Sequence, residues 1–228
     1  MKHETTPSGS NEHLVRQALS ASVDYQAYRL QVARHAAEGT TSGEDQSEAF
    51  IHYTLLNHRR MLRWEKKFEL PDATARWLSV GVRPQVWLVL TETWCGDAAP
   101  VLPVMNAFAG GSPNIELRIA QRDAHPDLMD QYRTDGALAI PKLLVLDPGS
   151  LEVLASWGPR PAVLMRMVRA FKEEHGKLSP EFRETMQRWY NRDKGQALIS
   201  ELVALLALEK IGDGAFLGGT IRFAEAGL

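Results

Sequence analysis

Hydrophobic and polar positions follow one period up to about residue 81 and a different one from residue 85 onward. In the first stretch, apolar side chains recur at every third or fourth position with polar residues between them, which is typical of amphipathic helices. Pro71 stops the second of these patterns, and Gly81 closes the third. The pattern predicts helices over residues 14–37, 47–70 and 71–80.

The pattern changes at Gln85, where a continuous run of apolar residues rich in β-formers predicts a strand that is covered on both faces. The turn sequence at residues 147–150 predicts that the last two strands form an antiparallel hairpin. The predicted order is strand 85–90, helix 96–109, strand 115–120, helix 125–132, strand 142–146, strand 152–157 and helix 161–175. We therefore expect an α/β fold with a central mixed sheet flanked by helices, and with helical N- and C-terminal extensions.

Changes in composition along the chain predict five segments. The polar first residues lack apolar surface that would fix them against a core, and the last stretch contains five glycines. The expected segments are a disordered tail over 1–13, a helical extension packed on the core over 14–81, the α/β domain over 82–175, C-terminal helices over 176–210 and a glycine-rich tail over 211–228.

Charge and cysteine content exclude several classes of function. The formal net charge is -2, so the chain lacks the broad positive field that nucleic-acid or anionic-membrane binding normally needs. One cysteine forms no intrachain disulfide and no thiolate-rich zinc site, which indicates a reducing compartment. The sequence lacks a signal peptide and a run of apolar residues that would span a membrane. We expect a cytoplasmic protein that needs no metal and no cofactor.

The single cysteine lies where chemistry is expected. The segment from Thr93 to Ala98 follows the buried strand and opens a helix, so the positive end of the helix dipole favours a thiolate at Cys95. Asp97 places a negative charge beside it and opposes ionisation. Cys95 is therefore either a nucleophile or a small buried residue.

A proline stands at the start of a predicted central strand. Pro141 follows Ile140 and precedes four apolar residues, a position where proline is awkward unless a special turn requires it. The bond between Ile140 and Pro141 is then either cis, as such turns favour, or an ordinary trans bond.

Together these motifs resemble the thioredoxin family over residues 85–175. The wider chain resembles a bacterial thioredoxin-like family of poorly defined role with a single-thiol Trp-Cys-Gly-Asp-Ala site. The matching positions are Trp94, Cys95, Gly96, Asp97 and Ala98, then Pro103, Ile140, Pro141 and Gly158, with Thr41-Ser42-Gly43 and Trp189-Tyr190 in the extensions.

The chain departs from the thioredoxin pattern at two positions that matter for activity. Ala98 replaces the second, resolving cysteine, so a mixed disulfide at Cys95 needs an external thiol such as glutathione for its release. Val89 stands where thioredoxins carry a buried acid that transfers protons. As an enzyme, the chain would be a thiol-disulfide oxidoreductase that lacks the resolving cysteine.

The resemblance also implies a substrate groove. Ile140, Pro141 and Gly158 match the loops with which thioredoxins hold extended peptides through backbone hydrogen bonds. Trp94 is either an apolar wall of this groove or a packing residue. Arg160 either reaches Cys95 and favours its thiolate or is a solvated loop residue.

Two functions follow from these residues. The first is a single-thiol redox protein, in which the Cys95 thiolate reacts with a disulfide or peroxide and an external thiol resolves the product. The alternative is a non-catalytic module that binds a protein in the groove around Trp94, Pro141 and Gly158. The expected partner is a protein or a small thiol or disulfide. The spacing of His52 and His58 does not fit a pair of metal ligands on one helix face.

Overall fold

The computed structural model describes the backbone of residues 8–212 and the side chains of residues 11–207. Its centre is a four-stranded sheet of β1 (Gln85–Thr91), β2 (Ile115–Gln121), β3 (Lys142–Leu146) and β4 (Val153–Trp157), in the order β2-β1-β3-β4. Strand β1 runs parallel to β2 and antiparallel to β3, and β4 runs antiparallel to β3. The predicted mixed sheet, with β3 and β4 as a hairpin, is confirmed.

Strand β1 is the core of this sheet. All seven of its residues are buried, because it is paired on both edges and covered by helices on both faces. Val89 pairs with Ile119 on one side and with Leu143 on the other. The functional segment after residue 91 therefore starts from one of the most rigid parts of the molecule.

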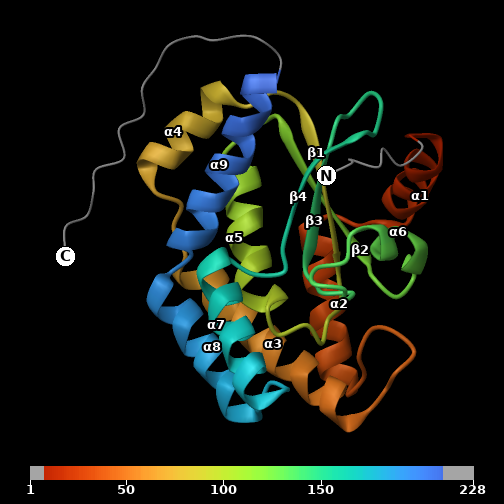
Figure 1. Ribbon diagram of the computed structural model, residues 1–228, viewed down its shortest axis with the longest axis vertical. Coiled ribbons are helices and arrows are strands. Elements are labelled where there is room, and N and C mark those ends of the chain that lie inside the picture. Colours follow the sequence, from red (N-terminus) through yellow and green to blue (C-terminus); the bar gives the residue numbers. More distant parts are fainter. Residues whose placement is uncertain (1–7, 213–228) are drawn as a thin grey trace.

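Helices cover both faces of the sheet (Figure 1). Helices α5 (Ala98–Gly110) and α7 (Ala162–His175) lie on one side, and the short α6 (Pro126–Gln131) lies on the other. Phe108 of α5 stacks on Trp87 of β1 with a ring separation of 5.5 Å. Both rings are fully buried, so this contact anchors the last turn of α5 to the sheet.

The N-terminal region differs from the single helix predicted over 14–37. It consists of α1 (Ser8–Ala21) and α2 (Tyr25–Glu38), separated at Val23. The backbone of Val23 exchanges two hydrogen bonds of 2.9 and 2.8 Å with Ile119 at the outer edge of β2, so it is not available to a helix. Asp24 then caps α2 by accepting from the amide of Ala27 at 2.7 Å.

Helix α1 also begins inside the stretch predicted as a disordered tail over 1–13. It starts at Ser8, and the side-chain amide of Asn11 donates to the hydroxyl of Tyr132 at 2.7 Å. A long-range contact of this kind orders the backbone that polar composition alone would leave loose.

The remaining helices flank the sheet and α5 along the length of the molecule (Figure 1). Helix α3 (Glu48–Lys67) packs against α2 and α5, and α4 (Asp72–Gly81) leads into β1. After α7 come α8 (Pro180–Asp193) and α9 (Gln196–Gly212), which lie on the same side as α5 in Figure 1. No helix in the described part of the chain is both long and apolar enough to span a membrane. Most of the tail predicted over 211–228 lies outside the described residues.

Candidate functional site

Cys95 lies in a tight turn between β1 and α5. Its backbone amide donates to the carbonyl of Glu92 at 3.1 Å, and the helix begins three residues later at Ala98. The residue is 5% exposed, and its Sγ atom donates to the carbonyl oxygen of Ile140 at 3.3 Å. The sulfur is therefore held as a hydrogen-bond donor against the loop that precedes β3.

Burial is the largest influence on this thiol. It raises the pKa of Cys95, the carboxylate of Asp97 raises it further, and the pKa is about 12. The backbone amides of Ala98 and Asp97 and the guanidinium of Arg160 act in the opposite direction. The dipole effect expected from the sequence is thus present, but burial outweighs it, and the thiol is protonated at neutral pH.

Asp97 is held by an ion pair and a hydrogen bond. Nη2 of Arg160 lies 2.6 Å from its Oδ2 atom, and the hydroxyl of Tyr190 donates to its Oδ1 atom at 3.1 Å. Both charged side chains are mostly buried, at 9% exposed for Asp97 and 17% for Arg160. Arg160 therefore acts on Cys95 from its ion pair with Asp97.

Helix α8 covers this ion pair from the outside. Tyr190 reaches Asp97, and the side-chain amide of Gln187 donates to the carbonyl of Gly96 at 2.8 Å. From the sequence, Tyr190 is identified only through the Trp189-Tyr190 pair of the family resemblance, and no signal indicates Gln187. Contacts between residues more than 90 positions apart place the C-terminal extension directly on the cysteine turn.

The loops before β3 and after β4 meet beside Cys95. The peptide bonds between Ile140 and Pro141 and between Gly158 and Pro159 are both cis. Gly158 has a φ of +121°, and a Cβ atom there would lie 2.2 Å from the carbonyl oxygen of Pro141. Only glycine fits this approach, so the structure gives a steric reason for glycine at this position.

A buried polar network supports the other side of the cysteine turn. The carboxylate of Glu92 accepts hydrogen bonds from the hydroxyl of Ser42 and from the amide of Asp123, the latter at 2.9 Å. The amide of Thr93 donates to the hydroxyl of Ser42 at 2.9 Å. Ser42 and Thr93 also belong to a cluster of hydroxyl groups with Thr41 and Thr54. The Thr41-Ser42-Gly43 turn is therefore a structural support of the site.

Glu92 and Asn57 are site residues that the sequence reasoning did not identify. Glu92 is fully buried, and burial raises its pKa. Asn57 donates to the carbonyl of Thr93 at 3.0 Å and accepts from Arg60 at 3.1 Å. The available signal for Asn57 is its position as a polar residue that interrupts the apolar face of α3.

A groove of about 650 Å³ opens in front of Cys95, between α3 and α8. Its aromatic wall is Trp94, which stacks on Phe50 with a ring separation of 4.4 Å and an interplanar angle of 7°. The guanidinium of Arg122 lies 4.9 Å from the centre of the Trp94 ring. Trp94 therefore packs against Phe50 and also lines the groove, so both roles considered for it from the sequence are present.

The groove carries more basic than acidic side chains. Its arginines are Arg60, Arg122, Arg160 and Arg183. Arg122 pairs with Asp123 and Arg160 with Asp97, each at 2.6 Å, so Arg60 and Arg183 are the groove arginines without an ion pair among the described residues. Its carboxylates, Asp97 and Glu184, are each already paired with an arginine at 2.6 Å. Negatively charged groups are therefore the favoured occupants. Of the residues predicted for the site, Trp94, Cys95, Gly96, Asp97, Ile140 and Arg160 line this groove.

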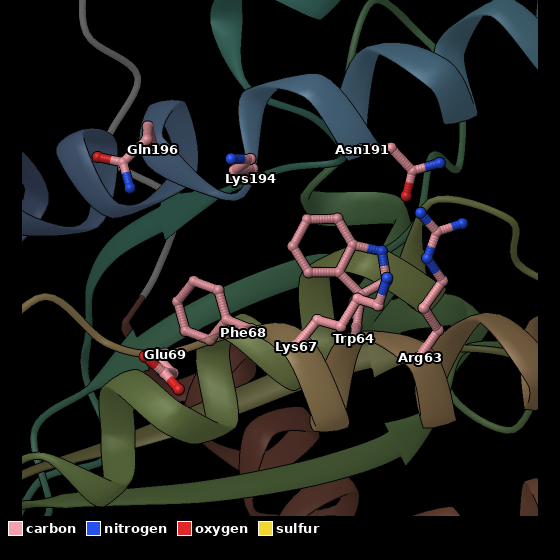
Figure 2. A pocket seen from close by; sticks show the side chains of 8 residues that line it. All are labelled: Arg63, Trp64, Lys67, Phe68, Glu69, Asn191, Lys194 and Gln196. Atoms are coloured by element: carbon pink, nitrogen blue, oxygen red, sulfur yellow. The ribbon is translucent and has the colours of Figure 1, made fainter.

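A second pocket of about 480 Å³ lies between the end of α3 and the turn that joins α8 to α9. Figure 2 shows the Trp64 and Phe68 rings along its floor, with Arg63 and Asn191 at one end and Glu69 at the other. None of its lining residues lines the groove at Cys95, so this pocket is a separate feature. Among the described residues, no three His, Cys, Asp or Glu side chains gather as a metal site would require.

Comparison with known proteins identifies the family. No curated protein matches the sequence. The structure resembles that of a protein of unknown function from Pseudomonas aeruginosa, with a TM-score of 0.56 and 20% identity over 87% of this chain and 96% of the other. It also resembles an HIV epitope scaffold, with a TM-score of 0.50 and 22% identity over 85% of this chain and 100% of the scaffold.

These two likenesses concern the fold, because their sequence identities are low, and they agree with the predicted mixed sheet with helical extensions. The sequence model of the thioredoxin family matches residues 43–175. This match covers more than half of the chain and includes the cysteine turn and the Pro141 loop. The chain belongs to the thioredoxin family.

Proposed function

We propose that this protein is a binding module that holds an extended, acidic segment of a partner protein in the groove in front of Cys95. The observation that carries the proposal is that the Cys95 thiol is buried and hydrogen-bonded. Its sulfur is buried and donates a hydrogen bond to the carbonyl of Ile140. The groove beside it remains open, so binding is available while thiolate chemistry is suppressed at rest.

The raised pKa of Cys95 supports this argument. Burial and the carboxylate of Asp97 raise it to about 12, so the thiol is protonated at neutral pH. Nucleophilic cysteines of redox proteins ionise near or below neutral pH, because the thiolate is the attacking species. The resting site therefore favours molecular recognition over disulfide exchange.

The lining of the groove defines the chemistry of the partner. Arg60 and Arg183 form no ion pair among the described residues and favour carboxylates. The stacked pair of Phe50 and Trp94 favours an aromatic or other planar side chain. The Pro141 loop presents backbone beside these side chains, as the family resemblance implies for extended peptides. An extended acidic segment with an aromatic residue satisfies all three features.

The test is a selection of short random peptides displayed on phage, with the immobilised full-length protein as bait in a reducing buffer. We expect enrichment of acidic sequences that contain an aromatic residue. The affinity of one enriched synthetic peptide is then measured by fluorescence anisotropy for three variants. Arg183→Ala should weaken binding about tenfold, and Cys95→Ser should leave it within about twofold.

Arg133→Ala is the matched control, because Arg133 is an arginine of α6's C-terminal flank that pairs with Asp130 and does not line the groove. We expect it to bind the peptide like the wild type. Enrichment of sequences without acidic residues, or equal losses for Arg183→Ala and Arg133→Ala, would contradict the proposal.

A second function is favoured by one observation. The amides of Asp97 and Ala98 and the guanidinium of Arg160 all lower the pKa of Cys95, although burial outweighs them. In single-thiol exchange, the Cys95 thiolate attacks one sulfur of a partner disulfide and releases the other as a thiolate; an external thiol then displaces the partner from Cys95. Peptide capture that requires Cys95 and is reversed by reductant would support this function in place of simple binding.

A further inference from the structure

Lys142 is a buried cation without a charged partner. It is the first residue of β3 and is 5% exposed. Its Nζ atom donates to the hydroxyl of Thr134 at 2.6 Å, which in turn donates to the carbonyl of Gly158 at 3.4 Å. No carboxylate in the described part of the chain forms an ion pair with it. A buried ammonium group normally has a counter-ion, because desolvation without one is costly.

A second unsatisfied donor borders the same space. Arg160 uses Nη2 for Asp97 and places Nη1 3.9 Å from the sulfur of Met165. Its Nε atom is buried and has no hydrogen-bond partner. Lys142, Thr134 and Arg160 all line a cavity of about 450 Å³, which lies on the side of the Gly158 loop that faces α7.

The charge of this cavity is positive. Two further arginines line it, Arg166 and Arg169, and only Arg169 has a carboxylate partner, Asp135. The one carboxylate of the lining, Glu201, accepts hydrogen bonds from the indole of Trp157 at 2.6 Å and from the first amide of α7 at 2.7 Å. Both of its oxygens are thus engaged elsewhere, which leaves Lys142 and Arg166 without a counter-ion.

We propose that this cavity binds a phosphate or phosphoryl group, with Lys142 and Arg166 as its cations and the Nε atom of Arg160 as a further donor. A tetrahedral oxyanion supplies several acceptors at once and so satisfies donors that come from different elements. The cavity is several times larger than a phosphate ion, which favours a phosphate monoester that carries a small organic group. The site differs from the groove in Lys142, Thr134 and Arg166, which do not line the groove, and the two sites share Arg160.

The test is thermal unfolding of the full-length protein in increasing inorganic phosphate or phenyl phosphate, with sodium chloride at equal ionic strength as reference. We expect both phosphates to raise Tm beyond the chloride reference in a saturable manner. Lys142→Met keeps the aliphatic stem and removes the charge, and Arg166→Gln changes only an exposed side chain. Each should weaken the phosphate affinity at least tenfold.

Arg16→Gln is the control, since Arg16 is an exposed arginine of α1 that pairs with Glu12 far from the cavity. It should respond to phosphate like the wild type. Tighter binding of phenyl phosphate than of inorganic phosphate would identify the ligand as a phosphoryl group on a larger molecule, and the reverse order would identify free phosphate. Phosphate effects no larger than those of chloride, or effects unchanged in both Lys142→Met and Arg166→Gln, would overturn the proposal.

Discussion

Arg160 and Asp97 form an ion pair of 2.6 Å directly beside the cysteine turn, and the hydroxyl of Tyr190 in α8 closes it from the outside. The two side chains act on the Cys95 thiol in opposite directions. The carboxylate of Asp97 raises the pKa of Cys95, and the guanidinium of Arg160 lowers it. The reactivity of the cysteine is thus set partly by a contact between the loop after β4 and the first turn of α5.

Removal of the Asp97 charge should make Cys95 more reactive. In Asp97→Asn the carboxylate that raises the pKa of Cys95 is gone, while Arg160 still lowers it. The thiolate fraction below that pKa rises about tenfold for each unit by which the pKa falls. The measurement is the rate of alkylation by iodoacetamide between pH 7 and 10, which should increase several-fold at each pH.

The control for this experiment is Asp130→Asn, which removes an exposed carboxylate of α6 that pairs with Arg133. We expect its alkylation rate to equal that of the wild type. If the Asp97 variant reacted no faster than this control, the charge of Asp97 would have no role in holding the thiol protonated.

Removal of Arg160 should destabilise the fold and further suppress the thiol. Arg160→Met leaves the mostly buried Asp97 carboxylate with only the Tyr190 hydroxyl, at an expected cost of about 3 kcal/mol in the free energy of unfolding. Urea unfolding measures this cost. The double variant Arg160→Met with Asp97→Asn should recover part of the loss, because no unpaired charge remains. Equal stability of the single and double variants would be inconsistent with this account.

The sheet was predictable because its residues carry the information locally. The continuous apolar run of β1 and the turn at residues 147–150 define strands and their pairing without knowledge of the rest of the chain. The break at Val23 was not predictable, because its cause is a backbone pairing with Ile119, nearly 100 residues away. The apolar spacing typical of a helix continues through this break, because only the three residues 22–24 leave the helical conformation.

The site was predictable in its members and not in its electrostatics. Trp94, Cys95 and Pro141 are recognisable from local motifs. Trp94 and Cys95 line one groove with Gly96, Asp97, Ile140 and Arg160, whereas Ala98, Pro141 and Gly158 lie outside its lining. The state of the thiol depends instead on how completely α8 and the loop at Ile140 cover it. That covering comes from tertiary packing, which a motif does not encode, and it reverses the expectation that the helix dipole alone suggests.

Gly158 should tolerate no side chain. Gly158→Ala would place Cβ 2.2 Å from the carbonyl oxygen of Pro141 at a φ of +121°, so the backbone must move. We expect a loss of about 3 kcal/mol in the free energy of unfolding, measured by urea denaturation. Gly149→Ala is the matched control, because the nearest atom to its Cβ is Oδ1 of Asp147 at an ordinary 3.4 Å. If Gly158→Ala lost less than about 1 kcal/mol relative to Gly149→Ala, the close approach of the two loops would contribute no more to stability than an ordinary surface residue does.

Glu92 should make the stability of the protein depend on pH in a defined direction. Burial raises the pKa of Glu92, so the folded state binds its proton more tightly than the unfolded state does. The favourable contribution of the protonated form is therefore lost as the pH rises from the unfolded value of about 4.3 through the raised folded value. Glu92→Gln carries no such proton, and its amide still offers an acceptor to Asp123 and a donor to Ser42.

Urea unfolding at several values between about pH 4 and pH 7 compares the two proteins. The free energy of unfolding of Glu92→Gln minus that of the wild type should increase across this range and then level off. Glu116→Gln, which changes an exposed glutamate of β2, should differ from the wild type by a constant amount. A difference for Glu92→Gln that stayed flat or fell with pH would mean that the hydrogen bonds from Ser42 and Asp123 stabilise the carboxylate more than burial penalises it.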